Sequence, residues 1–179
     1  MSFPAYELYQ DTAVEWFPRV PSDWNVTKLA RLLEDLPCYG VLVPDFQQDG
    51  IPMLRITDME DGNADRESLN KISHSLSDQY SRTLVKVGDV VLSVVGTIGV
   101  AFKIEENLAG VNLSRAVARI QVGGELLAEY LCWIFQTIQF TRYVDLICTG
   151  TAQRVLNMGD LSAFLIPTPP LPEQTAIAS

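Results

Sequence analysis

The residue types that most often carry out chemistry in proteins are scarce in this sequence. The chain has one histidine, His74, whose side chain is the best suited to general acid or base work near neutral pH. It lies in the polar stretch Lys71–Ser75, where no serine or cysteine nucleophile can be assigned to it. We therefore expect His74 to be an ordinary surface residue.

The three cysteines, Cys38, Cys132 and Cys148, form no C-x-x-C pair and have no metal-ligand spacing. Cys132 and Cys148 lie in apolar runs, which favours buried free thiols in a reducing compartment. The acidic stretch Asp58–Asp65 lacks the alternation and the closing glutamate of a calcium loop. We therefore predict no metal site, no cofactor and no catalysis by these residues.

Two glycine and proline motifs also fall short of catalytic patterns. Gly96-Thr97-Ile98-Gly99 lacks the lysine and the further glycines of a nucleotide-binding loop, so it predicts a tight turn between strands. Pro169-Pro170 follows a threonine, whereas a DNA methyltransferase motif needs asparagine or aspartate before the two prolines. Neither motif indicates an enzyme.

Composition and charge limit the remaining classes. The 179 residues are 47% hydrophobic and 20% charged, which is typical of one globular domain with its own core. The net charge of −9 excludes a domain that holds nucleic acid by bulk positive charge. The acid is concentrated in residues 1–67, with 13 acidic against 5 basic groups, whereas residues 107–172 hold four of each. The second region can thus present a neutral or basic face.

We find no signal peptide pattern and no apolar run long enough to span a membrane, and we expect a cytoplasmic protein.

Hydrophobic periodicity predicts an α+β fold, a twisted and mostly antiparallel sheet with a few helices. Runs rich in valine and other β-branched residues predict strands at 51–57, 84–87, 90–95, 100–104, 116–122 and 161–166. Helical spacing predicts one long helix at 125–143, a helix or turn at 27–36, a short helix at 75–83 capped by Ser75 or Ser77, and a terminal helix at 173–179. The segments 38–50 and 150–157 are predicted loops, and Gly88-Asp89 a hairpin turn.

Three segments, in a fixed order, carry a more specific pattern: Gly50–Met59, Val87–Gly99 and Ile166–Gln174. Pro21-Ser22-Asp23-Trp24, Asn112-Leu113-Ser114-Arg115 and Thr149-Gly150-Thr151-Ala152-Gln153-Arg154 support it. Taken together over residues 20–179, this set resembles the specificity subunit of type I restriction–modification systems.

The resemblance implies a target recognition domain at 21–166, an N-terminal arm at 1–20, and a proline hinge with the start of a spacer coiled-coil helix at 167–179. Such a domain reads one half of a bipartite site in double-stranded DNA and is not an enzyme. It docks a methylation subunit, which uses S-adenosylmethionine, and the complex recruits a restriction subunit. If the methylation subunit neutralises most phosphates, the acidity is explained, and the isolated domain binds DNA weakly with a small salt dependence.

Arginine pairs with guanine and asparagine or glutamine with adenine, while hydroxyl groups hold phosphates. On that basis the candidates for DNA binding are Arg55, Thr57, Lys71, Ser93, Thr97, Asn112, Ser114, Arg115, Gln153, Arg154 and Asn157. Plainer interpretations stay open for several of them. Arg55 can pair with Asp58, Arg115 and Arg119 can pair with other acids, and Gln153-Arg154 can be a solvated loop.

Two other classes also stay open. A protein-interaction adaptor would use the acidic region and the proline-rich tail, and it would bind its partner whether or not DNA is present. A small methyltransferase or nuclease half is the other class, and the missing cofactor and catalytic motifs count against it.

Overall fold

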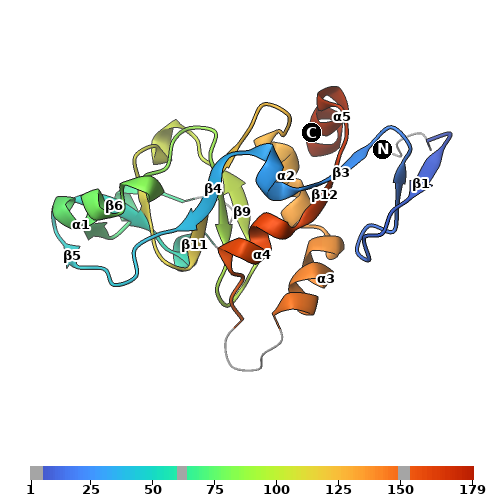
Figure 1. Ribbon diagram of the computed structural model, residues 1–179. Helices are drawn as coiled ribbons and strands as arrows, with labels where there is room; N and C mark the ends of the chain where they lie inside the picture. The colour runs from blue at the N-terminus through green and yellow to red at the C-terminus, as the bar shows by residue number, and fades with distance from the viewer. Residues whose placement is uncertain (1–5, 60–63, 149–153) are drawn as a thin grey trace.

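The centre of the molecule is a four-stranded antiparallel sheet in a computed structural model that describes residues 6–59, 64–148 and 154–179 (Figure 1). The strands follow the order β4 (Leu33–Tyr39), β11 (Val117–Val122), β8 (Val90–Ser93) and β9 (Ala101–Lys103). Side chains alternate between the two faces, so Val90 and Leu92 enter one hydrophobic cluster and Val91 enters another. Because apolar groups cover both faces, every residue of β8 is buried.

A second four-stranded sheet lies at the end of the molecule that also holds α1 (Figure 1). Its order is β10 (Asn112–Leu113), β6 (Ile51–Leu54), β7 (Lys71–Ile72) and β5 (Phe46–Gln47). Two short antiparallel pairs join β1 (Tyr9–Asp11) to β2 (Arg19–Pro21) and β3 (Asn25–Lys28) to β12 (Leu165–Thr168). Only β10 and β6 pair in parallel among the named strands of the described residues. The predicted α+β class with a mostly antiparallel sheet is confirmed.

Helices cover the face of the central sheet that carries Val90 and Leu92. The α-helices are α1 (His74–Gln79), α2 (Ala128–Phe135), α3 (Ile138–Ile147), α4 (Met158–Ala163) and α5 (Leu171–Ala178). Short 3-10 helices occupy Leu29–Leu32, Ile56–Asp58, Arg66–Ser68, Ser81–Thr83 and Glu106–Leu108. The aromatic centre of this layer is Phe164, whose ring lies 5.2 Å from Phe140 and 4.7 Å from Tyr143 between centroids. Phe140 and Tyr143 thus belong to the core, while Trp133 is 45% exposed.

The predicted long helix at 125–143 is wrong in its extent, because the chain forms two helices there. α2 ends at Phe135, and Thr137 begins α3 by accepting a hydrogen bond from the Phe140 amide at its side-chain oxygen. This N-cap lets the chain turn while Phe135 and Phe140 remain in contact, with ring centroids 4.8 Å apart. The apolar spacing continues across the break, which is why periodicity alone does not reveal it.

Other boundaries also differ from the prediction. Strands occupy most of 27–36, with a 3-10 turn only at Leu29–Leu32, and Cys38–Tyr39 belong to β4 rather than to a loop. Segment 84–87 forms no strand, and 161–166 divides between α4 and β12. The short helix α1 is capped by Ser73, which accepts from the Leu76 amide, and not by Ser75 or Ser77. The periodicity of these short apolar runs does not distinguish helix from strand, so their conformation is decided by the segments they pack against.

The histidine and the cysteines agree only in part with the burial predicted for them. His74 is exposed at the start of α1. All three cysteines are free, but only Cys132 is fully buried, and burial raises the pKa of its thiol to about 12. Cys38 and Cys148 are half-buried, so the prediction of buried thiols holds for Cys132 alone.

The terminal helix α5 is fixed to the domain by its first turn. The buried Gln174 side chain accepts from the Leu127 amide at 2.9 Å and donates to the carbonyls of Glu125 and Pro169, each at 2.9 Å. The carboxylate of Glu173 accepts from the Trp24 indole nitrogen at 2.8 Å. The predicted helix start near Pro172 is confirmed, and its direction is set by contacts from both ends of the chain.

Candidate nucleic-acid interface

Four distant chain segments lie side by side beyond the ends of β4, β11 and β8. The Arg115 amide donates to the Val41 carbonyl at 2.9 Å, and the Val94 amide donates to the Ala116 carbonyl at 2.9 Å. The Leu156 amide in turn donates to the Val94 carbonyl at 2.8 Å. These bonds join segments 39–42, 114–116, 94–96 and 154–156 into one irregular extension of the sheet. Three of them belong to the motifs Asn112–Arg115, Val87–Gly99 and Thr149–Arg154 or directly follow one of them.

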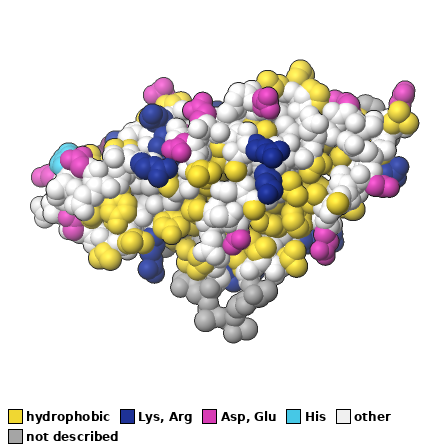
Figure 2. All heavy atoms as spheres, in the orientation of Figure 1, with side chains coloured by type: hydrophobic (Ala, Val, Ile, Leu, Met, Phe, Trp, Pro, Cys, Tyr) yellow, Lys and Arg dark blue, Asp and Glu magenta, His cyan; other side chains and the backbone are white. Residues whose placement is uncertain are grey.

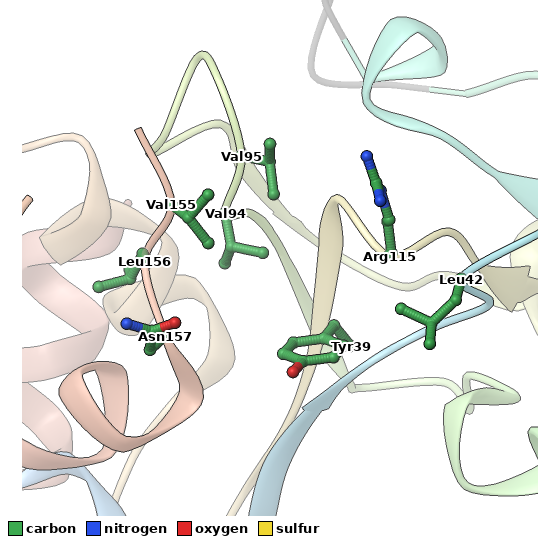
Figure 3. Close-up of a pocket in the computed structure, with 8 residues that line it drawn as sticks. All are labelled: Tyr39, Leu42, Val94, Val95, Arg115, Val155, Leu156 and Asn157. Atoms are coloured by element: carbon green, nitrogen blue, oxygen red, sulfur yellow. The ribbon is translucent and has the colours of Figure 1, made fainter. Parts of the chain in front are cut away.

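Two neighbouring hollows open on this extension. The first, of about 260 Å³, is lined among others by Tyr39, Leu42, Val155 and Asn157. The second, of about 550 Å³, is lined among others by Ile56, Gly96 and Thr97. Val95 and Arg115 line both, and we call the two hollows together the Arg115 groove. In Figure 3, Tyr39, Leu42 and Arg115 stand on one side of the first hollow and Val155, Leu156 and Asn157 on the other.

The charge of the Arg115 groove differs from that of the whole chain. No carboxylate is found among the described residues that line it, and Arg115 is their only charged side chain. Acidic and basic groups are otherwise interspersed, and the face seen in Figure 2 shows no large basic patch. An anionic ligand can therefore approach this groove without local repulsion, although the chain carries a net charge of −9.

Arg115 has a free guanidinium group beside the groove. Among the described residues, five of the thirteen lysines and arginines form ion pairs with carboxylates. The Arg115 side chain is exposed, and its guanidinium group forms no hydrogen bond or ion pair with any described residue, so the alternative in which Arg115 pairs with an acid is not what the structure has. Arg119, the neighbouring case, is buried and donates from Nε to Asp89 Oδ2 at 2.6 Å.

The structure brings some of the predicted residues together in the groove. Thr97, Arg115 and Asn157 line it, and Thr97 lies in the predicted turn, whose flanking glycines have positive φ angles. Ser114 adjoins it, with a buried hydroxyl oxygen that has no partner among the described residues. Arg154 pairs with Asp145 at 2.5 Å, and Gln153 lies outside the described residues.

Other predicted residues are engaged elsewhere. Ser93 is buried, and its hydroxyl oxygen accepts from the Val100 amide at 2.9 Å. Arg55 pairs with Asp58 at 2.9 Å, and Thr57 is exposed one residue beyond Ile56. Lys71 is half-buried in β7 and does not line the Arg115 groove.

Sequence reasoning missed the apolar part of the groove. Tyr39, Leu42 and Val155 are 47%, 53% and 44% exposed, although they lie in or beside predicted polar loops. Large exposed apolar side chains that gather in one place commonly mark a binding surface. The signal available in the sequence was Val41-Leu42-Val43, an apolar run inside a loop rich in proline and glutamine.

Asn112 has a structural environment, since it is fully buried at β10. Its side-chain oxygen accepts from Thr83 Oγ1 at 2.6 Å and from the Leu113 amide at 2.8 Å, and its amide nitrogen donates to Ser77 Oγ at 3.0 Å. We expect Asn112→Ala to lower the free energy of unfolding by about 2–3 kcal/mol, because buried partners lose their hydrogen bonds. Urea denaturation measures this, with the exposed Asn107→Ala as the control, expected within about 0.5 kcal/mol of the parent protein. Equal small effects in both variants would contradict the structural role.

Within the described residues, no helix is long and apolar enough to cross a membrane. The same residues contain no group of three or more histidine, cysteine or acidic side chains placed to hold a metal ion.

Comparisons with known proteins show the family of the chain. Residues 21–179 match the family described as type I restriction modification DNA specificity domain. The chain is 33% identical over 163 residues to the type I restriction enzyme EcoBI specificity subunit of Escherichia coli, covering 88% of this chain and 34% of that protein. It is 25% identical to the MjaVIII specificity subunit of Methanocaldococcus jannaschii, covering 89% of this chain and 39% of that protein. The chain thus spans little more than a third of these curated relatives.

Solved structures agree at the level of the fold. The HsdS subunit from Thermoanaerobacter tengcongensis aligns with a TM-score of 0.66 at 22% identity, over 89% of this chain and 36% of that one. A structure described as the basis of complex assembly and conformational transition of a type I restriction–modification system aligns with a TM-score of 0.68 at 21% identity, over 89% of this chain and 37% of that one. The predicted non-catalytic specificity domain is confirmed by the family match, and the chain belongs to the type I restriction modification DNA specificity domain family.

Proposed function

We propose that this chain reads one half of a bipartite target in double-stranded DNA and that the Arg115 groove faces the duplex. The observation that carries the proposal is the convergence of the family-like motifs on one acid-free hollow with an unpaired arginine. Thr97, Arg115 and Asn157 supply polar groups there, and Tyr39, Leu42 and Val155 supply apolar contact. Polar groups read the hydrogen-bonding edges of bases, and apolar groups read the methyl group of thymine.

The proposed partners follow from the charge of the chain. With a net charge of −9, the domain cannot neutralise many phosphates by itself. A methylation subunit that surrounds the duplex would supply most of that charge, and a restriction subunit would join the full complex. We propose that the complex acts in the cytoplasm.

The test is a selection from a random duplex pool by this chain, with and without its methylation subunit, at physiological salt. We expect one short motif to be enriched with the partner present, and weak retention with a small salt dependence when the chain is alone. Retained DNA is sequenced after each round. Nanomolar sequence-selective binding by the chain alone would contradict the role given to the partner.

The same experiment distinguishes a DNA-reading domain from a protein-interaction adaptor. If the methylation subunit binds the chain but no motif is enriched, the chain is a docking module and the proposed reading of DNA is wrong. A complex assembled with a different domain of the same family, but with the same methylation subunit, is the control. It should enrich its own motif, which shows that the partner alone does not select the sequence.

A further inference from the structure

We propose that Arg115 reads a guanine in the major groove and that the apolar side chains beside it contact the methyl group of a neighbouring thymine. This inference rests on the proposed function and names the base step that the Arg115 groove recognises.

The position of Arg115 suits a reading side chain. Its backbone is held on both sides, because its amide donates to the Val41 carbonyl and the Ser114 amide donates to the Leu54 carbonyl, each at 2.9 Å. Arg115 is the second residue of a turn that the Val117 amide closes by donating to the Ser114 carbonyl at 3.0 Å. The Arg115 side chain is exposed on this turn, whereas the Ser114 hydroxyl oxygen is buried. The guanidinium group thus extends from a backbone that is held in place, and it has no partner within the described residues. It can therefore bind a ligand without first breaking an ion pair.

The surroundings favour a base edge over a phosphate as that ligand. Phosphate contacts are made by clusters of cations, hydroxyls and backbone amides. Here Arg115 is the single cation among the described lining residues, and its neighbours Leu42, Val95 and Val155 are apolar. Apolar side chains gain nothing beside a hydrated phosphate, but they pack well on a thymine methyl group.

The combination also indicates the groove and the base. The thymine methyl group is present only in the major groove, and guanine offers there two acceptors, O6 and N7, that match the arginine fork. Adenine presents one donor and one acceptor at the same place, and cytosine presents a donor. A guanine next to an A·T base pair therefore fits this surface, because the guanine can bind Arg115 and the thymine methyl group can pack on Leu42, Val95 and Val155.

The first test compares selections by the wild-type complex, by Arg115→Gln and by Arg31→Gln. The Arg31 side chain is exposed, has no partner within the described residues and lines neither hollow. Arg31→Gln therefore removes the same positive charge as Arg115→Gln, but away from the groove. We expect Arg115→Gln to lose preference at one guanine position by about 5- to 150-fold and to keep the rest of the motif. Arg31→Gln should leave the motif unchanged.

The second test alters the DNA and leaves the protein intact, so it does not depend on how a variant folds. The selected site is synthesised with 7-deazaguanine, which lacks the N7 acceptor, and separately with uracil, which lacks the methyl group of thymine. We expect the wild-type complex to lose affinity for both sites, Arg115→Gln to be insensitive to the first change, and Leu42→Ala to be insensitive to the second. Affinities are measured by fluorescence anisotropy over a series of salt concentrations, and the sites are compared at the same salt concentration.

The outcomes distinguish this inference from the proposed function. Failure of the wild-type complex to enrich any motif overturns both. A motif that is unchanged in Arg115→Gln and tolerates 7-deazaguanine overturns the guanine reading alone. Uniform weakening on all sequences, with a salt slope reduced by about one, would identify a phosphate contact and would also overturn it.

Discussion

Phe164→Ala is expected to lower the free energy of unfolding by about 3–5 kcal/mol, because it removes the ring around which the helical layer packs. Phe164 is fully buried, and its ring lies 6.1 Å from Trp16 in addition to its contacts with Phe140 and Tyr143. Single domains are stable by only about 5–15 kcal/mol, so this variant loses a large fraction of its stability. Equilibrium denaturation in urea measures the change.

The matched control is Phe46→Ala, which removes the same side chain from a position that is 52% exposed. We expect a change of less than about 1 kcal/mol there, since about half of that residue is already exposed to water. Comparable losses in the two variants would contradict the placement of Phe164 at the centre of the core.

Asp89→Ala is expected to destabilise the domain by about 3–5 kcal/mol, because it leaves the charge of Arg119 buried without a counter-ion. Arg119 and Asp89 are 6% and 5% exposed, and Arg119 Nη1 also donates to the Arg82 carbonyl at 2.7 Å. The pair fixes the turn at Gly88-Asp89 against β11, in which Arg119 lies four residues after Arg115. Thermal and urea denaturation of the purified chain measure the loss.

Asp35→Ala provides the control, since Asp35 pairs with Arg82 at 3.2 Å on the surface, where both side chains are more than half exposed. Its expected cost is about 0–1 kcal/mol. The double variant Asp89→Leu with Arg119→Met should be more stable than Asp89→Ala, because no unpaired charge is left behind. If Asp89→Ala and Asp35→Ala cost the same, the buried pair contributes no more than a surface pair.

Sequence patterns identified the central sheet well because its strands are chemically distinct. Val90–Ser93 and Val117–Val122 are short, β-branched and bounded by turn residues, and both formed as predicted. Leu33 and Leu36 were misassigned because a helical spacing of leucines also fits a strand in which some leucines stay exposed; Leu36 is 61% exposed in β4. The break at Thr137 depends on a side-chain cap, which apolar periodicity does not detect.

Only some of the polar residues of the candidate site could be predicted from the sequence. The motifs that contain Thr97 and Arg115 were identified, but nothing local distinguishes the free Arg115 from the buried, paired Arg119 four residues later. Asn112 looked equally suited to adenine, yet its partners Ser77 and Thr83 lie 35 and 29 residues away and appear only in the folded chain. Which polar groups stay free is decided by tertiary contacts.

The attachment of α5 has a mechanical consequence that depends on length. A helix that continued from α5 for about 30 residues would be about 45 Å long, and a tilt of about 10° at its base would move its far end by about 8 Å. That displacement exceeds two base-pair steps of about 3.4 Å each. In such a helix the hydrogen bonds of Gln174 and Glu173 would lie at the base, where a small change in angle becomes a large displacement of the far end. If that helix held two reading domains apart, the stiffness of its base would set how sharply the spacing between two half-sites is defined.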